Sequence, residues 1–282
     1  MNILCTFPGK HGDCLWALPT VRAISETTGE PVDLMLAPAI AGLKPLIERQ
    51  AYVGEVLICD QWTLQDTAPV TPRKPPCATK YEKSYERILH LGYPAWPRPD
   101  LPRDIYDRAT MGVDFVIAPL DLDRPWITPP WPLPTSSLCC GFTDEHFELK
   151  YGLRWLMRQR FDQLGTPYGS IDLSTSPRWL QEGRLPGCSW ETAAAWLASA
   201  KVFLGCCSAL HVLACAVGTP VVLMEPNPHR HHEVFYPYGK LGRWRVQLVT
   251  GGDGQPTFDA RHVGDAVAAI LAREVPDGVR PV

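Results

Sequence analysis

The chain has 282 residues, which is enough for one large domain or for two smaller ones. Hydrophobic residues make up 45% of it and charged residues 20%, as in globular proteins, and no apolar run is long enough to span a bilayer. The net charge of −3 gives no electrostatic reason to favour nucleic acid as a partner. The opening segment lacks the basic start and long apolar run of a signal peptide, so we expect it to form the first strand.

Ten cysteines raise the question of disulfides. Several of them lie inside apolar strand or helix patterns, as Cys5, Cys59 and Cys215 do, and two pairs are adjacent in the sequence. No CxxC motif occurs, so neither a zinc site nor a thioredoxin-like site is indicated. We therefore expect reduced cysteines that pack as small hydrophobic side chains in a cytoplasmic protein.

Short apolar runs alternate with helical patterns from the start of the chain. The expected strands are Asn2–Phe7, Val32–Ala37, Glu55–Cys59 and Ile88–Leu91, and the expected helices are about Cys14–Thr28 and Ile40–Arg49. This alternation predicts a parallel sheet covered by helices. Residues 61–110 are less regular and rich in proline, which is typical either of a binding face or of a surface loop.

A proline-rich segment, Arg124–Thr135, can form neither a helix nor a central strand and predicts a stiff linker. A second α/β series follows it. Its expected strands are Ser137–Phe142, Ile171–Leu173, Val202–Gly205 and Pro220–Met224, and its expected helices are Leu149–Leu164, Ser189–Ala200, Ala209–Val217 and Ala260–Arg273. The predicted fold class is α/β with two Rossmann-like domains, at residues 1–124 and 136–260, joined by a linker at 125–135 and followed by a helix and tail at 261–282.

The motif Lys10-His11-Gly12-Asp13 lies where the first strand passes into the first helix. Open α/β sheets bind ligands at the carboxyl ends of their strands. Gly12 would let the backbone approach a ligand closely. Asp13 is placed either to cap the helix or to act as a catalytic carboxylate.

A second motif lies between the expected strand Val202–Gly205 and the helix that follows it. The turn Gly205–Ser208 would leave backbone N–H groups at a helix N-terminus, which favours a bound diphosphate. His211, in the first turn of that helix, would face the same pocket or else serve as a core or capping residue.

These motifs carry a family resemblance. The strand, the Gly12-Asp13 turn and the helix with Leu18-Pro19 and Arg22 resemble the N-terminus of the ADP-heptose:lipopolysaccharide heptosyltransferases. The block from Cys188 to His211 resembles the donor-site motif of that family, in which an Asp-Ser/Thr-Gly-x-x-His turn connects a strand to a helix.

The resemblance implies a GT-B fold, in which two Rossmann-like domains face each other across a cleft. It implies an N-terminal acceptor domain, a C-terminal nucleotide-sugar domain and an inverting, metal-independent transfer to an acceptor hydroxyl, with Asp13 as the base. No cofactor is implied beyond the nucleotide-diphosphate sugar that serves as donor. The expected donor-binding residues are Gly12, Lys150, Cys188, Cys206, Cys207, Ser208, Ala209, His211 and Glu225, although Glu225 could equally be a solvated charge at a strand end. The expected acceptor-binding residues are His11 and, from an aromatic and arginine-containing stretch that does not match the family, Arg98 and Arg103.

The sequence departs from the family in the donor turn, where Cys206-Cys207-Ser208 replaces Asp-Ser/Thr-Gly. One alternative is therefore a catalytically silent protein that binds a nucleotide sugar. The acceptor could be a glycan, another hydroxyl compound or a hydroxylated DNA base, because the fold does not decide between them. An epimerase or hydrolase on the same scaffold would need a second acid–base pair, which the sequence does not offer.

Overall fold

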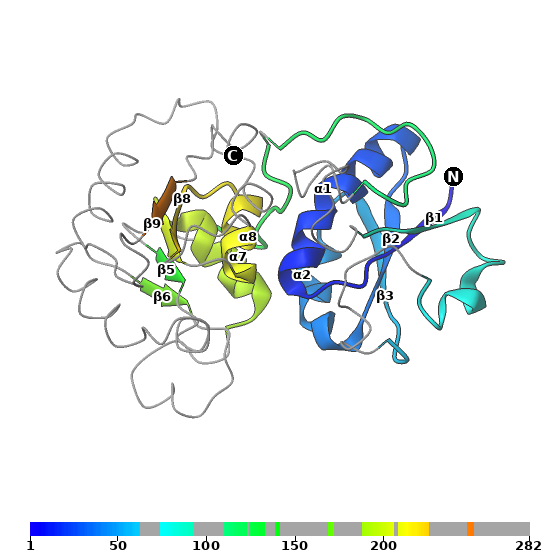
Figure 1. Ribbon diagram of the computed structural model, residues 1–282, viewed down its shortest axis with the longest axis horizontal. Helices are drawn as coiled ribbons and strands as arrows, with labels where there is room; N and C mark the ends of the chain where they lie inside the picture. Colours follow the sequence, from blue (N-terminus) through cyan, green and yellow to red (C-terminus); the bar gives the residue numbers. More distant parts are fainter. Residues whose placement is uncertain are drawn as a thin grey trace. The chain divides into compact units, whose positions relative to one another are not determined.

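The computed structural model describes residues 1–62, 74–92, 110–122, 124–132, 188–203 and 208–222, and the backbone of 139–141, 169–171, 204–205, 223–225 and 247–250. The chain folds into two compact units (Figure 1). The first consists mainly of Met1–Leu122 with Trp126–Thr128, and the second mainly of Pro129–His232 and Tyr238–Val282.

The first unit contains a four-stranded parallel sheet in the order β3-β2-β1-β4. Its strands are β1 (Ile3–Thr6), β2 (Val32–Leu36), β3 (Val53–Ile58) and β4 (Arg87–His90). The chain passes from β1 outward to β2 and β3, and then returns to place β4 on the other side of β1. The sheet therefore has a topological switch point between β1 and β4, which is where open α/β sheets bind ligands.

Helix α1 (His11–Thr28) follows β1 and packs against β2 and β3 (Figure 1). Apolar side chains from α1 and the strands form a buried core, since neither a strand face nor a helix stripe can bury its apolar surface alone. The expected second helix is divided into a 3-10 helix, η1 (Pro38–Leu43), and a short α-helix, α2 (Lys44–Ile47). Proline near the start of each piece cannot donate a backbone hydrogen bond, which breaks the continuous helix predicted here. A second short 3-10 helix, η3 (Ala78–Tyr81), precedes β4.

The first part of the expected linker packs on the first unit. Trp126 and Ile127 are almost completely buried there. The Tyr52 hydroxyl donates to the Trp126 carbonyl at 2.5 Å, and the Thr128 N–H donates to Gln50 Oε1 at 2.8 Å. Trp126–Thr128 thus belongs to the first unit, with Trp126 and Ile127 in its core, although a linker was predicted here.

The second unit contains a five-stranded parallel sheet in the order β6-β5-β7-β8-β9. Its strands are β5 (Cys139–Gly141), β6 (Gly169–Ile171), β7 (Phe203–Gly205), β8 (Val221–Glu225) and β9 (Gln247–Thr250), and the last of these was not predicted. Helix α8 (Ala209–Ala216) packs against β7, β8 and helix α7 (Trp190–Ser199). The predicted α/β class with parallel sheets is confirmed, while the predicted helices at 149–164 and 260–273 lie outside the described residues.

Candidate functional site

The switch point of the first sheet is bordered by the turn between β1 and α1 and by the end of β4. Thr6 and His90 are the last residues of β1 and β4, and they are partners in the strand register. Thr6 Oγ1 and His90 Nδ1 form a hydrogen bond of 2.8 Å. The carboxyl end of this sheet therefore carries a hydrogen-bonded polar pair, and one member of it, Thr6, ends the strand that leads into the motif with Asp13.

Asp13 lies in the first turn of α1, three residues after the N-cap. The helix begins at His11, earlier than predicted, so Lys10 rather than Asp13 is the N-cap. The Lys10 N–H donates to Asp13 Oδ2 at 2.9 Å, which is the N3 half of a capping box. Asp13 thus caps the helix from position N3 instead of from the expected N-cap position. Its carboxylate lies half-buried at the carboxyl edge of the sheet.

Gly9 is the glycine on which this turn depends. A Cβ at Gly9 would lie 2.3 Å from the Asp13 Cβ and 2.5 Å from the Phe7 ring, so only glycine fits beside the carboxylate. Sequence reasoning named Gly12 for a close backbone approach, but Gly12 lies inside α1 as its second residue. Gly9 directly follows Pro8, and this Pro-Gly pair was the available signal.

Two histidines lie at this edge. His11, expected at the acceptor site, is half-buried in the first turn of α1, and burial lowers its pKa. Burial and the nearby Lys74 cation lower the pKa of His90. Sequence analysis missed His90, because only the pairing of β4 with β1 brings it to Thr6, 84 residues away. Arg98 and Arg103, the other expected acceptor residues, lie outside the described residues.

The second sheet has its switch point between β5 and β7, since β6 lies on one side of β5 and β7 on the other. Helix α8 follows β7 in the chain, so its N-terminus lies at this point. Ser208 is the N-cap of α8, and its hydroxyl accepts a hydrogen bond from the His211 N–H at 3.4 Å. Ala209 is the first residue of the helix. Cys206 and Cys207 lie outside the described residues.

His211 is only 1% exposed, and burial lowers its pKa to about 3. The imidazole is therefore neutral at neutral pH, and any contact with a diphosphate would use a neutral ring nitrogen rather than a cation.

The remaining expected donor residues are spread over the second unit. Cys188 lies directly before Ser189, the N-cap of α7, and burial raises the pKa of its thiol to about 11. Glu225 is the last residue of β8, beside Thr250 of β9 in the strand register. Its side chain and Lys150 lie outside what the structure describes. The donor set thus stays a prediction, anchored by the positions of α8 and β8.

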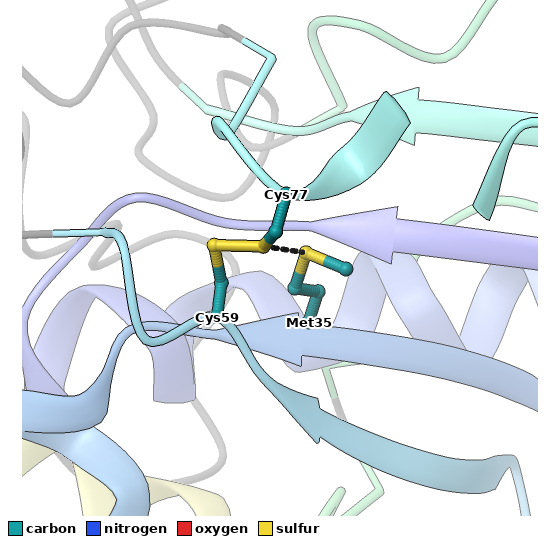
Figure 2. The surroundings of a disulfide bond; sticks show 3 residues. All are labelled: Met35, Cys59 and Cys77. Atoms are coloured by element: carbon teal, nitrogen blue, oxygen red, sulfur yellow. Dashed lines mark hydrogen bonds between the residues drawn. A yellow bond between two sulfur atoms is a disulfide. The ribbon is translucent and has the colours of Figure 1, made fainter. Parts of the chain in front are cut away.

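A disulfide joins Cys59, one residue after β3, to Cys77, the N-cap of η3 (Figure 2). The Cys77 sulfur lies 3.5 Å from Met35 Sδ on β2 (Figure 2). The expectation of reduced cysteines throughout is therefore wrong for this pair. The apolar pattern around Cys59 could not reveal the disulfide, because it is the same for a free thiol and for a bonded cysteine. The bonded partner, Cys77, lies 18 residues away in the sequence.

No helix among residues 1–62, 74–92, 188–203 and 208–222 is both long and apolar enough to cross a membrane. Within the described part of the chain, no three His, Cys, Asp or Glu side chains gather as metal ligands.

Comparison with known proteins finds matches only among solved structures. No model of a known protein family matches the sequence, and no curated protein does. A glycosyl transferase family 9 protein from Veillonella parvula is 11% identical, with a TM-score of 0.59 over 96% of this chain and 97% of that one.

Two heptosyltransferases from E. coli are similar to the chain to about the same extent. WaaC, solved with ADP, is 13% identical, with a TM-score of 0.55 over 98% of this chain and 99% of that one. ADP-heptose lps heptosyltransferase II is 14% identical, with a TM-score of 0.54 over 98% of this chain and 100% of that one. The resemblance found in the sequence is thus confirmed at the level of the fold: the chain has the α/β fold of heptosyltransferases and related GT-B glycosyltransferases.

Proposed function

We propose that the chain is an inverting, metal-independent glycosyltransferase that moves a sugar from a nucleotide-diphosphate sugar to an acceptor hydroxyl. The observation that carries the proposal is the placement of chemically suitable groups at both switch points. A carboxylate, Asp13, lies at the carboxyl edge of the first sheet, and the N-terminus of α8 lies at that of the second. The fold shared with heptosyltransferases supports this proposal.

Asp13 is suited to act as the general base. The Lys10 N–H donates to Oδ2 of Asp13 and so orients the carboxylate that would accept the proton. In the transfer step the acceptor O–H gives its proton to Asp13 while its oxygen forms a bond to the anomeric carbon. The bond from that carbon to the phosphate oxygen breaks on the opposite face at the same time, so the configuration inverts.

The leaving nucleoside diphosphate takes the electron pair of the broken bond and gains negative charge. The N–H groups of Ala209 and Leu210 at the start of α8 and the helix dipole would stabilise that charge without a metal ion.

The proposal is tested first by calorimetry with a panel of nucleotide-diphosphate sugars, followed by mass spectrometry of the products after incubation with hydroxyl acceptors. We expect one nucleotide class to bind, to release its nucleoside diphosphate and to yield a glycoside with inverted anomeric configuration by NMR. Activity should persist in the presence of EDTA. Binding without release or transfer would contradict the proposal and support a nucleotide-sugar binding protein.

The base is tested with two variants. Asp13→Asn keeps an oxygen that can accept from the Lys10 N–H but cannot take a proton, so we expect transfer to fall by about 10²–10⁴-fold with little change in donor affinity. Asp13→Ala should lose both transfer and the cap, and should also unfold at lower denaturant concentration. Full turnover by the Asn variant would leave Asp13 as a helix cap only.

A further inference from the structure

The Thr6–His90 pair at the first switch point has a fixed geometry. Thr6 is completely buried, and its hydroxyl holds His90 Nδ1 at 2.8 Å. The strand ends are also joined through the backbone, since the Leu91 N–H donates to the Thr6 carbonyl at 2.9 Å. The orientation of the imidazole is therefore set by the sheet before any ligand binds.

A glycine, Gly112, packs against the backbone at the end of β4. Gly112 has φ +93°, and a Cβ there would lie 2.1 Å from the His90 carbonyl oxygen. Any other residue would be strained by its backbone conformation and would also collide with β4. The turn at Gly112 thus packs directly on the backbone of His90.

The second ring nitrogen of His90, Nε2, differs from Nδ1 in its hydrogen bonding. The ring is half-buried, and within the part of the chain that the structure describes the side chain makes one hydrogen bond, through Nδ1. Nε2 is therefore available to a ligand. A polar atom that is held rigidly at a switch point and has no hydrogen-bond partner among the described residues is a candidate binding group.

The charge state indicates what kind of ligand would suit this nitrogen. Burial and the Lys74 cation lower the pKa of His90, so the imidazole is neutral at neutral pH. The Thr6 hydroxyl can donate to Nδ1 or accept from it, which leaves Nε2 as either a donor or an acceptor. A hydroxyl group can also take either role and needs no charge, whereas a phosphate or carboxylate would favour an imidazolium ion.

We propose that His90 is an acceptor-binding residue whose Nε2 forms a hydrogen bond with a hydroxyl group of a carbohydrate or similar polyol. This proposal rests on the proposed function, in which the acceptor reacts at the carboxyl edge that Asp13 shares with His90. It assigns to β4 a contact that no sequence motif indicated. The Asp13 carboxylate would then receive the reacting proton while His90 holds the acceptor.

Binding is tested by long-range ¹H–¹⁵N NMR of the histidine side chains, titrated with methyl glucoside, methyl galactoside and methyl mannoside, and with inorganic phosphate as the anionic comparison. His90 is assigned from the signals missing in the His90→Asn spectrum. We expect a glycoside to shift the Nε2 signal of His90 more than its Nδ1 signal, and phosphate to have a smaller effect. No shift with any glycoside, or a larger shift with phosphate, would overturn the proposal.

Two substitutions separate ligand binding from a purely structural role. His90→Asn places an amide near the position of Nδ1 and keeps the Thr6 contact but has no polar atom near Nε2, whereas His90→Gln places its amide near Nε2. We expect the glycoside affinity to fall about tenfold in the Asn variant and less in the Gln variant, as the loss of one hydrogen bond predicts. The reverse order would show that the Thr6 contact is what matters. Far-UV circular dichroism checks that both variants fold.

Donor hydrolysis, measured separately, distinguishes this proposal from the proposed function. Hydrolysis of a nucleotide sugar without any glycoside shift at His90 would overturn the acceptor contact alone. A glycoside shift at His90 in a chain that neither binds nor hydrolyses any nucleotide sugar would preserve the polyol site and contradict the transferase.

Discussion

A proline inside α1 leaves one carbonyl that the helix cannot satisfy in the usual way. Pro19 has no N–H to donate to the carbonyl of Leu15, four residues earlier. The indole N–H of Trp126 donates to that carbonyl at 3.1 Å. Trp126 thus supplies, from a segment more than a hundred residues away, the donor that proline removes from the helix.

This substitution of donors predicts a coupling between the two residues. Trp126→Phe should lower the free energy of unfolding by about 1–3 kcal/mol, because the buried Leu15 carbonyl loses its donor. In a Pro19→Ala background the new N–H of residue 19 can donate to the same carbonyl, so the effect of Trp126→Phe should be smaller. Urea unfolding of the four chains of the double-mutant cycle measures the difference. Equal effects in both backgrounds would contradict the coupling.

At the scale of the helix, α8 carries a histidine that folding keeps uncharged. Burial lowers the pKa of His211 from 6.5 to about 3, so between these values the unfolded chain binds a proton that the folded chain does not. Since the unfolded state then holds more protons, the free energy of unfolding decreases as the pH falls below about 6.5. One such group contributes at most about 1.4 kcal/mol per pH unit.

His211→Gln replaces the titratable imidazole with a neutral side chain that binds no proton in this pH range. We expect the variant to show a shallower loss of stability between pH 6 and pH 4.5 than the natural chain, measured by urea unfolding at several pH values. His11 and His90, whose pKa values are also lowered, remain in both proteins and so cancel in the comparison. Identical pH slopes would mean that His211 is protonated equally in the folded and unfolded states.

The elements themselves were largely predictable, because apolar runs and helical spacing are local. The strands β1, β2 and β4 and the helices α7 and α8 appear within a few residues of their predicted bounds. The start of α1 was less predictable. Capping by Lys10 depends on its backbone rather than its side chain, so Asp13 was expected at the N-cap and lies instead at N3.

What the sequence did not reveal depends on pairing between distant segments. The Thr6–His90 hydrogen bond requires the register of β1 with β4, and the Trp126–Leu15 hydrogen bond requires the proline-rich segment to pack on α1. Neither is a property of a local pattern. The candidate site was therefore predictable as a region, at the carboxyl end of the first strand, but not as a set of side chains in contact.

At the scale of the whole molecule, the Cys59–Cys77 disulfide sets one segment of the first unit against its sheet. Cys59 is tied to β2 through its N–H, which donates to the Leu36 carbonyl at 2.9 Å, and Cys77 carries η3. Disulfides persist mainly in oxidising compartments. The disulfide therefore does not favour the predicted cytoplasmic location.

The disulfide predicts how the chain responds to a reductant. Its 18-residue separation corresponds to a loop-closure contribution of about 3 kcal/mol, so dithiothreitol should lower the free energy of unfolding by about that amount. The Cys59→Ala/Cys77→Ala variant should start at the lower stability and no longer respond to the reductant. Cys188→Ala, which removes a free cysteine, should respond as the natural chain does. Urea unfolding with and without dithiothreitol compares the three proteins. The reductant breaks the disulfide in the unfolded state in any case. If the free energy of unfolding of the natural chain does not change with dithiothreitol, the bond contributes nothing to folding.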